Sequence, residues 1–318
     1  MPYVALPVET RASREAGAQA HWAAIRARRP DLEPAVALQE RLISLVVGLA
    51  ETVEHGRLPR LSLPPRYVAA KLRKGVPVMS AEPIPMPTPV LAPTLLALCG
   101  ALAEGGAGEA ARHIEEAIAT GRLEAGSLLS ASLARDQQAI RTGGVHHGLA
   151  PDLVWLVAEL AVSPFAHALQ RTLVDVPGRT DADQALRAAL DGWSHGYCLF
   201  CGSWPALIEH WAEAPTVGVL RCSFCALAWS LPSPGCAYCG ERGAAFVSSI
   251  PDATHPDRRL EACGSCRSYL KAMAVDEPAP FPLLAIADLD TMDVDMTAMQ
   301  SGLQRPPLRI FPLGQSRK

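Results

Sequence analysis

The sequence predicts an α+β protein in which an all-α N-terminal domain precedes two small modules rich in cysteine. Several segments of the first 190 residues have helical character, the clearest with apolar side chains every three or four positions, and no strand-like alternation persists there. After Trp193 the chain changes to short β-prone pieces, and eight of its nine cysteines stand as four C-x-x-C pairs between Cys198 and Cys266. The predicted units are residues 1–190, 191–233, 234–276 and a proline-bounded tail, 277–318.

One apolar stripe identifies a helix over residues 35–53. Its members are Ala35, Leu38, Leu42, Leu45, Leu49 and Val53. Further helices are predicted at 11–29, 91–103, 109–120, 127–141, 151–174 and 181–190. We expect Ser163-Pro164 to kink or split the helix that contains it. Between Val76 and Pro93, six prolines forbid regular helix, so this stretch is predicted to be an extended connector over the surface.

The C-terminal third is predicted to contain short strands. The β-prone segments are 204–211, 217–221, 226–231, 244–250, 259–262 and 268–275. Each is too short to be stable alone, so bound metal must supply folding energy that a small core cannot. In the tail, four aspartates between Asp288 and Asp295 lack the glycine and the terminal glutamate of a calcium loop. We expect them to form a solvated acidic face.

The four cysteine pairs have the spacing of metal-binding turns. They are Cys198 with Cys201, Cys222 with Cys225, Cys236 with Cys239, and Cys263 with Cys266. Two intervening residues let a tight turn direct both sulfurs at one ion, and two such turns complete a tetrahedral four-sulfur site. The eight cysteines therefore predict two metal sites.

The spacers between the pairs predict which pairs share a metal. There are 20 residues between the first and second pairs and 23 between the third and fourth, but only 10 between the second and third. The first and third pairs also share an aromatic residue before the second cysteine and a glycine after it. This repeat is typical of a duplicated ribbon. The predicted sites are Cys198, Cys201, Cys222 and Cys225, and Cys236, Cys239, Cys263 and Cys266; a cross-braced arrangement is the alternative.

The residue types leave the metal open, because four thiolates in a tetrahedron suit zinc and a single iron equally well. A closed four-sulfur site offers no open coordination position, which argues against a metalloenzyme. The sequence contains no phosphate loop, dinucleotide fingerprint or catalytic triad. The functional alternatives are a structural zinc-ribbon adaptor for another protein or nucleic acid, and a thiol–disulfide oxidoreductase that uses a C-x-x-C pair.

Charge and hydropathy argue against nucleic acid and against membrane insertion. The net charge is −3, and residues 191–277 carry nine acidic and six basic side chains, so no basic stripe is present. The most apolar run, 90–103, is broken by Pro93 and is shorter than the ~20 residues of a bilayer span. The N-terminus lacks a secretory signal pattern. We expect a cytoplasmic protein, whose reducing surroundings favour metal-bound C-x-x-C pairs over disulfides.

Longer motifs surround the cysteine pairs: C-L-F-C-G-S-W-P (198–205), R-C-S-F-C (221–225), C-A-Y-C-G (236–240) and C-G-S-C-R-S-Y-L-K (263–271). With the helical N-terminal half, they make the chain resemble the FdhE family of formate dehydrogenase accessory proteins. The resemblance extends weakly along the helical half, and residues 304–315 match the family only loosely.

This resemblance implies a cytoplasmic maturation factor rather than an enzyme. Its partner would be the catalytic subunit of a respiratory formate dehydrogenase, bound before that subunit is exported. The family is associated with rubredoxin-like iron, so the resemblance implies two iron ions, with zinc as the alternative. The implied ligands are Cys198, Cys201, Cys222, Cys225, Cys236, Cys239, Cys263 and Cys266.

Overall fold

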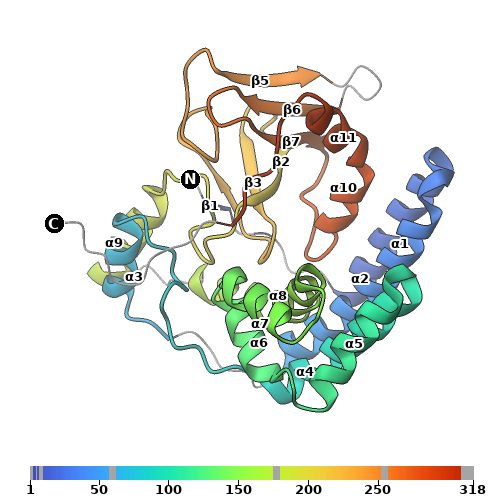
Figure 1. The fold of residues 1–318 in the computed structure, drawn as a ribbon. Coiled ribbons are helices and arrows are strands. Elements are labelled where there is room, and N and C mark those ends of the chain that lie inside the picture. The colour runs from blue at the N-terminus through green and yellow to red at the C-terminus, as the bar shows by residue number, and fades with distance from the viewer. Residues whose placement is uncertain are drawn as a thin grey trace.

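The helices of the N-terminal half lie against one end of a β-sheet formed by the C-terminal half (Figure 1). This computed structural model describes residues 3–4, 6, 10–56, 62–174, 180–251 and 257–308. Residues 309–318, which include most of the segment 304–315 that matches the family only loosely, lie outside the described residues.

The N-terminal half is helical, as predicted. Its helices are α1 (Arg11–Arg28), α2 (Glu33–His55), α3 (Pro65–Arg73), α4 (Thr88–Leu102), α5 (Gly108–Ala119), α6 (Ala125–Leu133), α7 (Gln137–His146), α8 (Pro151–Val174) and α9 (Asp181–Asp191). A 3-10 turn (Pro30–Leu32) joins α1 to α2, and a π-helical turn (Ala103–Ala107) joins α4 to α5. Of these helices, α3 was missed by the sequence prediction, because it is short and follows several prolines.

Two helix predictions differ from the structure. The single helix predicted over 127–141 is two helices, since Arg135 takes a left-handed φ of 60° and Asp136 then caps α7 by accepting from Ala139 N. The second difference is at Pro164, where α8 continues as one helix, so the helix is not split there; the expected kink stays a prediction. The proline leaves the carbonyl of Leu160 without its usual helical donor, and the Ser163 hydroxyl donates to that oxygen at 3.1 Å.

The main hydrophobic core joins the helical half to the first cysteine module. It gathers apolar side chains of α4, α5, α6 and α8 together with Leu199, Phe200 and Phe224, which stand between or beside the first four cysteines. A second cluster packs α1 and α2 against Leu283 and Ile286 of the tail. The first cysteine module is therefore part of the domain core rather than an appendage.

Six strands of the C-terminal half and one short strand from the N-terminus form a seven-stranded sheet among the described residues. Its strands are β1 (Tyr3–Val4), β2 (Pro205–Trp211), β3 (Gly218–Cys222), β4 (Ala228–Ser230), β5 (Phe246–Pro251), β6 (Arg258–Cys263) and β7 (Ser268–Val275), in the order β1-β4-β3-β2-β7-β6-β5. The six strands that follow Trp193 confirm the predicted segments. The N-terminal strand β1, which pairs with β4, was not predicted.

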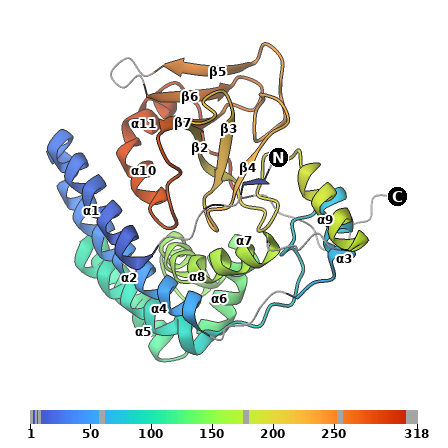
Figure 2. The same ribbon diagram turned by 180° about the vertical axis from the view of Figure 1, so that it is seen from behind.

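The two cysteine modules are antiparallel meanders, β2-β3-β4 and β5-β6-β7, joined side by side. The joint is a parallel pairing of β2 with β7, in which Ile208 lies opposite Ala272. Each module places its cysteine turns at strand ends, with Cys222 closing β3 and Cys263 closing β6. The two modules therefore share one sheet, whose strands are seen from behind in Figure 2.

The tail folds back onto the sheet as α10 (Leu284–Asp290) and α11 (Met292–Gln300). The expectation of a solvated acidic face was wrong. Lys271 on β7 is 3% exposed, and its Nζ lies 2.7 Å from Asp288 Oδ1 and 2.6 Å from Asp295 Oδ2. The guanidinium of Arg258 on β6 is held in the same way by Asp290. The aspartates are counterions for cations that the sheet buries.

Two stretches are long and apolar enough for a membrane span by length and composition alone, Thr88–Ala119 and Pro151–Thr172. The first is α4 and α5, joined across a bend at Gly106, whose φ of 117° is not helical. The second belongs to α8, and 67% of its apolar window is buried inside the protein. Core helices commonly have this composition, so the two stretches are weak evidence for a membrane.

Candidate metal centres

The first four cysteines converge on one point. The sulfur atoms of Cys198, Cys201, Cys222 and Cys225 all lie within 4.8 Å of one another. Cys198 Sγ is 3.7 Å from Cys225 Sγ, and Cys201 Sγ is 3.4 Å from Cys222 Sγ. Thiolates about 2.3 Å from a central ion form a tetrahedron with edges of about 3.8 Å. The spacing thus fits a four-sulfur metal site, and none of the four is in a disulfide.

The other four cysteines form a second group of the same size. The sulfur atoms of Cys236, Cys239, Cys263 and Cys266 also lie within 4.8 Å of one another. The Cys236–Cys266 and Cys239–Cys263 sulfur distances are both 3.6 Å. These are the groupings that the spacers predict, and the cross-braced alternative is excluded. The residues present fit two tetrahedral ions, and the geometry suits zinc and iron alike.

A shared backbone turn builds the sites. In each of the four C-x-x-C pairs, the residue directly after the second cysteine takes a left-handed φ: 82° at Gly202, 57° at Ala226, 79° at Gly240 and 54° at Arg267. The sequence marks this position with glycine in two of the pairs only. Ala226 and Arg267 take the same conformation at a steric cost, which indicates that closure of the sulfur group determines the turn.

The hydrogen bonds of the first and third pairs also repeat. Gly202 N donates to Cys198 O and Gly240 N donates to Cys236 O, each at 2.9 Å. The next bonds in each turn, Cys198 N to Ser203 O and Cys236 N to Glu241 O, are both 2.8 Å long. The two modules are therefore structural copies at the level of the turn.

The helical half holds the first site in place. Val78 N donates to Leu199 O and Met79 N donates to Phe200 O, each at 2.9 Å. These residues belong to the proline-rich connector, which we expected over the surface; Val78 and Met79 are instead 0% and 5% exposed. Prolines prevented a helix, but they left extended backbone free to pair with the cysteine turn. The apolar pair after Pro77 was the signal for burial.

A buried histidine makes a further link. His167 on α8 stacks on Phe281 of the tail, with ring centroids 4.5 Å apart, and its Nδ1 lies 2.9 Å from Cys225 O. Burial lowers the pKa of His167 to about 3, so the neutral ring donates this hydrogen bond. Sequence reasoning did not identify this residue, because a single histidine in an apolar helix gives no sign of its partner.

The sulfurs of the first site are buried from solvent, and the guanidinium of Arg135 lies near them. Burial raises the pKa of Cys198 and Cys225. Burial acts in the same direction on Cys201, but hydrogen bonds with the other three cysteines and the charge of Arg135 outweigh it and hold its pKa well below the ordinary value. The Arg135 guanidinium lies 3.9 Å from the centroid of Phe224. Four buried thiolates need a cation among them, and a bound metal ion would supply it.

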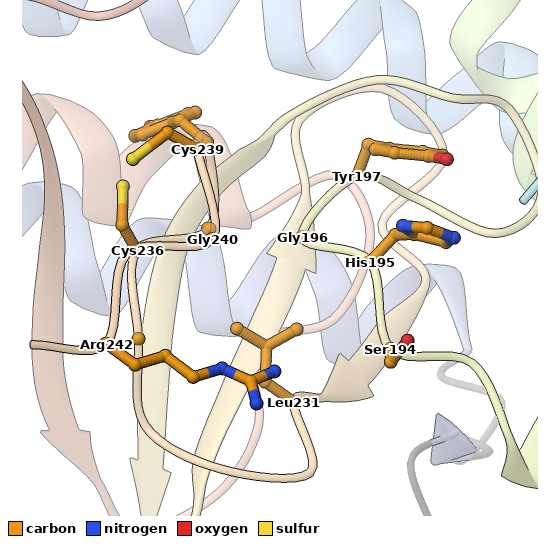
Figure 3. A pocket seen from close by; sticks show the side chains of 12 residues that line it. Ser194, His195, Gly196, Tyr197, Leu231, Cys236, Cys239, Gly240 and Arg242 are labelled. Carbon is orange, nitrogen blue, oxygen red and sulfur yellow. The ribbon is translucent and has the colours of Figure 1, made fainter. Parts of the chain in front are cut away.

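The second site is more open. Cys239 is exposed and Cys266 is half-buried, whereas Cys236 and Cys263 are buried. Burial acts to raise the pKa of Cys266, but hydrogen bonds from the side chain and backbone of Ser268 outweigh it and lower the pKa to about 7. A pocket of about 160 Å³ lies beside this site. Figure 3 shows Cys236 and Cys239 together on one side of the pocket, with His195 and Tyr197 on the other.

Similar proteins are known by sequence and by structure. A curated FdhE homolog from Glaesserella parasuis is 32% identical over 115 residues, which is 36% of this chain and 37% of the relative. Another from Edwardsiella ictaluri is 28% identical over 197 residues, which is 62% of this chain and 56% of the relative. The chain thus aligns with little more than a third of the first relative's length, and no family model matches it.

The crystal structure of the FdhE protein from Pseudomonas aeruginosa has the same fold. The match has a TM-score of 0.57 and covers 99% of this chain and 100% of that chain, at 19% sequence identity. The chain is similar to FdhE proteins in part of its sequence and in its fold. The resemblance read from the cysteine motifs is confirmed, and so is the fold class of a helical half followed by two four-cysteine modules. At 19% identity the structural match supports the fold alone, and the sequence relatives support the family.

Proposed function

We propose that this protein is an accessory factor in the maturation of a respiratory formate dehydrogenase. In this proposal it binds the catalytic subunit in the cytoplasm before export, and its eight clustered cysteines ligate two rubredoxin-like iron ions. The observation that carries the proposal is the pair of four-sulfur groups, each with its sulfurs within 4.8 Å of one another, in a chain similar to FdhE proteins.

The geometry favours binding over catalysis. Four sulfurs complete a tetrahedron, so a bound ion has no open position for water or substrate. An iron held in this way changes its charge by one unit between its oxidation states, which could shift an equilibrium at a protein interface. The chain's own residues hold the ion, and at the first site they exclude water. The eight thiols require a reducing compartment, which supports a cytoplasmic location.

Metal content tests the first part of the proposal. Protein purified without oxygen is analysed for iron and zinc, and its visible spectrum is recorded. We expect two iron ions per chain, with the absorption of iron bound by thiolates. Two zinc ions would favour the structural adaptor instead. Eight free thiols without any bound metal would remove the basis of the proposal.

Partner capture tests the second part. The tagged chain is mixed with extract from cells that make a respiratory formate dehydrogenase, and we expect its catalytic subunit to be retained. An unrelated protein that carries the same tag is the control. Retention of nucleic acid in place of the subunit would support the adaptor alternative. Insulin reduction by the wild type that is abolished by Cys198→Ala would support a thiol–disulfide oxidoreductase.

A further inference from the structure

The two sulfur groups have the same size and turn geometry but different surroundings. We propose that the first site keeps its metal permanently as part of the core, whereas the second is an exchange site that opens at Cys239. The inference rests on the proposed role of the cysteines as metal ligands, and it assigns a different task to each group.

The two sites differ in how far their sulfurs are exposed to solvent. Cys198, Cys201, Cys222 and Cys225 are 0%, 6%, 1% and 0% exposed. An incoming thiol or chelator therefore has no route to the first site while the core is folded. At the second site Cys239 is exposed. Ligand exchange requires an incoming donor to approach as a sulfur leaves, so it begins where solvent reaches a sulfur.

The two sites also differ in how their cysteine turns are held by other parts of the protein. The first site is fastened from outside its module by the connector residues Val78 and Met79 and by His167 on α8. At the second site, the turn that holds Cys263 and Cys266 is fastened by the tail, since Gln304 N donates to Arg267 O at 2.9 Å. One half of the second site is therefore as well supported as the first site.

The other half of the second site takes its hydrogen bonds from its own module, and the Tyr238 ring also lies against Trp204 of the first module, with centroids 5.1 Å apart. In the turn from Cys236 to Cys239, Cys236 N donates to Glu241 O and the Tyr238 hydroxyl donates to Tyr269 O, at 2.8 and 3.1 Å. No helix or strand begins between residues 231 and 245, so this turn stands in a loop. The exposed sulfur therefore lies in a loop whose hydrogen bonds come from its own module, which makes Cys239 the ligand that leaves first.

The pocket beside this segment provides an approach. It is lined by Cys236 and Cys239 and continues past Gly196 to His195 and Tyr197 (Figure 3). Its volume of about 160 Å³ admits small donors such as a low-molecular-weight thiol. In the exchange step the Cys239 sulfur would leave with its electron pair and take up the proton that the incoming thiol releases as it binds at the vacated position. No oxidant or reductant is needed.

The test uses the full chain loaded with two zinc ions. A coloured chelator, 4-(2-pyridylazo)resorcinol, is added in excess, and zinc release is followed by absorbance. We expect one equivalent to be released at least tenfold faster than the other. Native mass spectrometry should detect the chain with a single zinc between the two phases.

Alkylation then identifies the site that has opened. Iodoacetamide is added at the one-zinc stage, where a free thiolate attacks its carbon, a sulfur–carbon bond forms and iodide leaves. Peptide mass spectrometry should locate the label on Cys236, Cys239, Cys263 and Cys266. Cys99, which is buried on α4 and has its pKa raised to about 12 by burial, is the internal control and should stay unlabelled while the protein is folded.

The outcomes separate this inference from the proposed function. A chain that loads no metal contradicts the proposed function. A chain that loads two zinc ions and releases both in one phase leaves the proposed function intact and overturns the exchange site. Label on Cys198, Cys201, Cys222 or Cys225 at the one-zinc stage would reverse the assignment and overturn it as well.

Discussion

The two cysteine modules have nearly identical turns in very different environments. The turns Cys198–Cys201 and Cys236–Cys239 are each followed by a glycine with a left-handed φ, and their backbone hydrogen bonds have the same pattern. The first lies among the side chains of α4 and α8 in the main core, whereas the second ends at an exposed cysteine. The C-x-x-C-G segment therefore takes the same turn in both modules. The protection of its sulfurs from solvent depends on which other elements cover them.

The sheet order explains the difference. The first module, β2-β3-β4, lies nearer to α8, while the second, β5-β6-β7, extends away from the N-terminal helices (Figures 1 and 2). The second module is covered instead by the tail, with Val294 and Ala298 of α11 packed on Leu260 and Tyr269. This cover lies on the strands and leaves the Cys239 turn open.

Removing one sulfur from each site should give the largest contrast. We expect Cys198→Ser to lower the free energy of unfolding by on the order of 5 kcal/mol or more, because structural metal binding contributes about 10–16 kcal/mol and the site has no water to replace the lost ligand. Cys239→Ser should cost about 2 kcal/mol, since solvent reaches the fourth position. Thermal unfolding under anaerobic conditions, with metal content measured on the same samples, provides the comparison.

Equal losses in these two variants would contradict the unequal protection of the sites. Cys99→Ser is the matched control, because it removes a buried thiol that belongs to neither group. It should leave the metal content at the wild-type value.

Loss of a buried carboxylate should lower the free energy of unfolding more in the first module than where the tail covers the second module. In the first module Glu209 and Arg221 are paired and are 1% and 0% exposed in their side chains, and Glu209 also accepts from Ala279 N at 3.1 Å. Glu209→Gln leaves the guanidinium buried without its counterion and should cost about 3–5 kcal/mol. Asp295→Asn, in the tail helix that covers the second module, should cost about 1–2 kcal/mol, because Lys271 on β7 keeps Asp288.

Chemical denaturation of both variants measures this difference. Gln39→Ala is the control for a general loosening of the tail. Gln39 on α2 donates a hydrogen bond to Ala285 O of the tail, so this variant weakens the tail contact without removing a buried charge. A larger loss for Asp295→Asn than for Glu209→Gln would mean that the second module, not the first, depends more on buried charge.

The sequence predicted local features better than contacts between distant segments. The grouping of the cysteines followed from their spacers, and the strands followed from β-prone runs between them. The burial of Val78 against Leu199, the link from His167 to Cys225 and the counterions of Lys271 all join residues far apart in the chain. Such contacts depend on the packing of whole elements, which composition and periodicity do not encode. The unequal exposure of the two sites belongs to this second class.

A substitution at Gly196 in the first module, which contacts Ala237 in the second, should perturb the protein less. A Cβ added at Gly196 would lie 1.9 Å from Ala237 O, so Gly196→Ala must push the Cys236–Cys239 turn away. We expect a loss of about 1–3 kcal/mol from overpacking and faster metal release from the second site. The chelator assay should show an unchanged slow phase. Acceleration of both phases would indicate that the two sites are coupled through this contact.

The smallest predicted effect concerns one hydrogen bond at the second site. Tyr238→Phe removes the hydroxyl that donates to Tyr269 O and keeps the ring whose centroid lies 5.1 Å from that of Trp204. The loss should be about 0.5–1.5 kcal/mol, and release of the second metal should quicken several-fold because the turn loses a fastening. His167→Phe is the matched change at the first site, since it removes the bond to Cys225 O and keeps a ring against Phe281. If His167→Phe speeds the first release while Tyr238→Phe leaves the second unchanged, anchoring of the Cys236–Cys239 turn does not control exchange, and exposure of Cys239 alone must account for it.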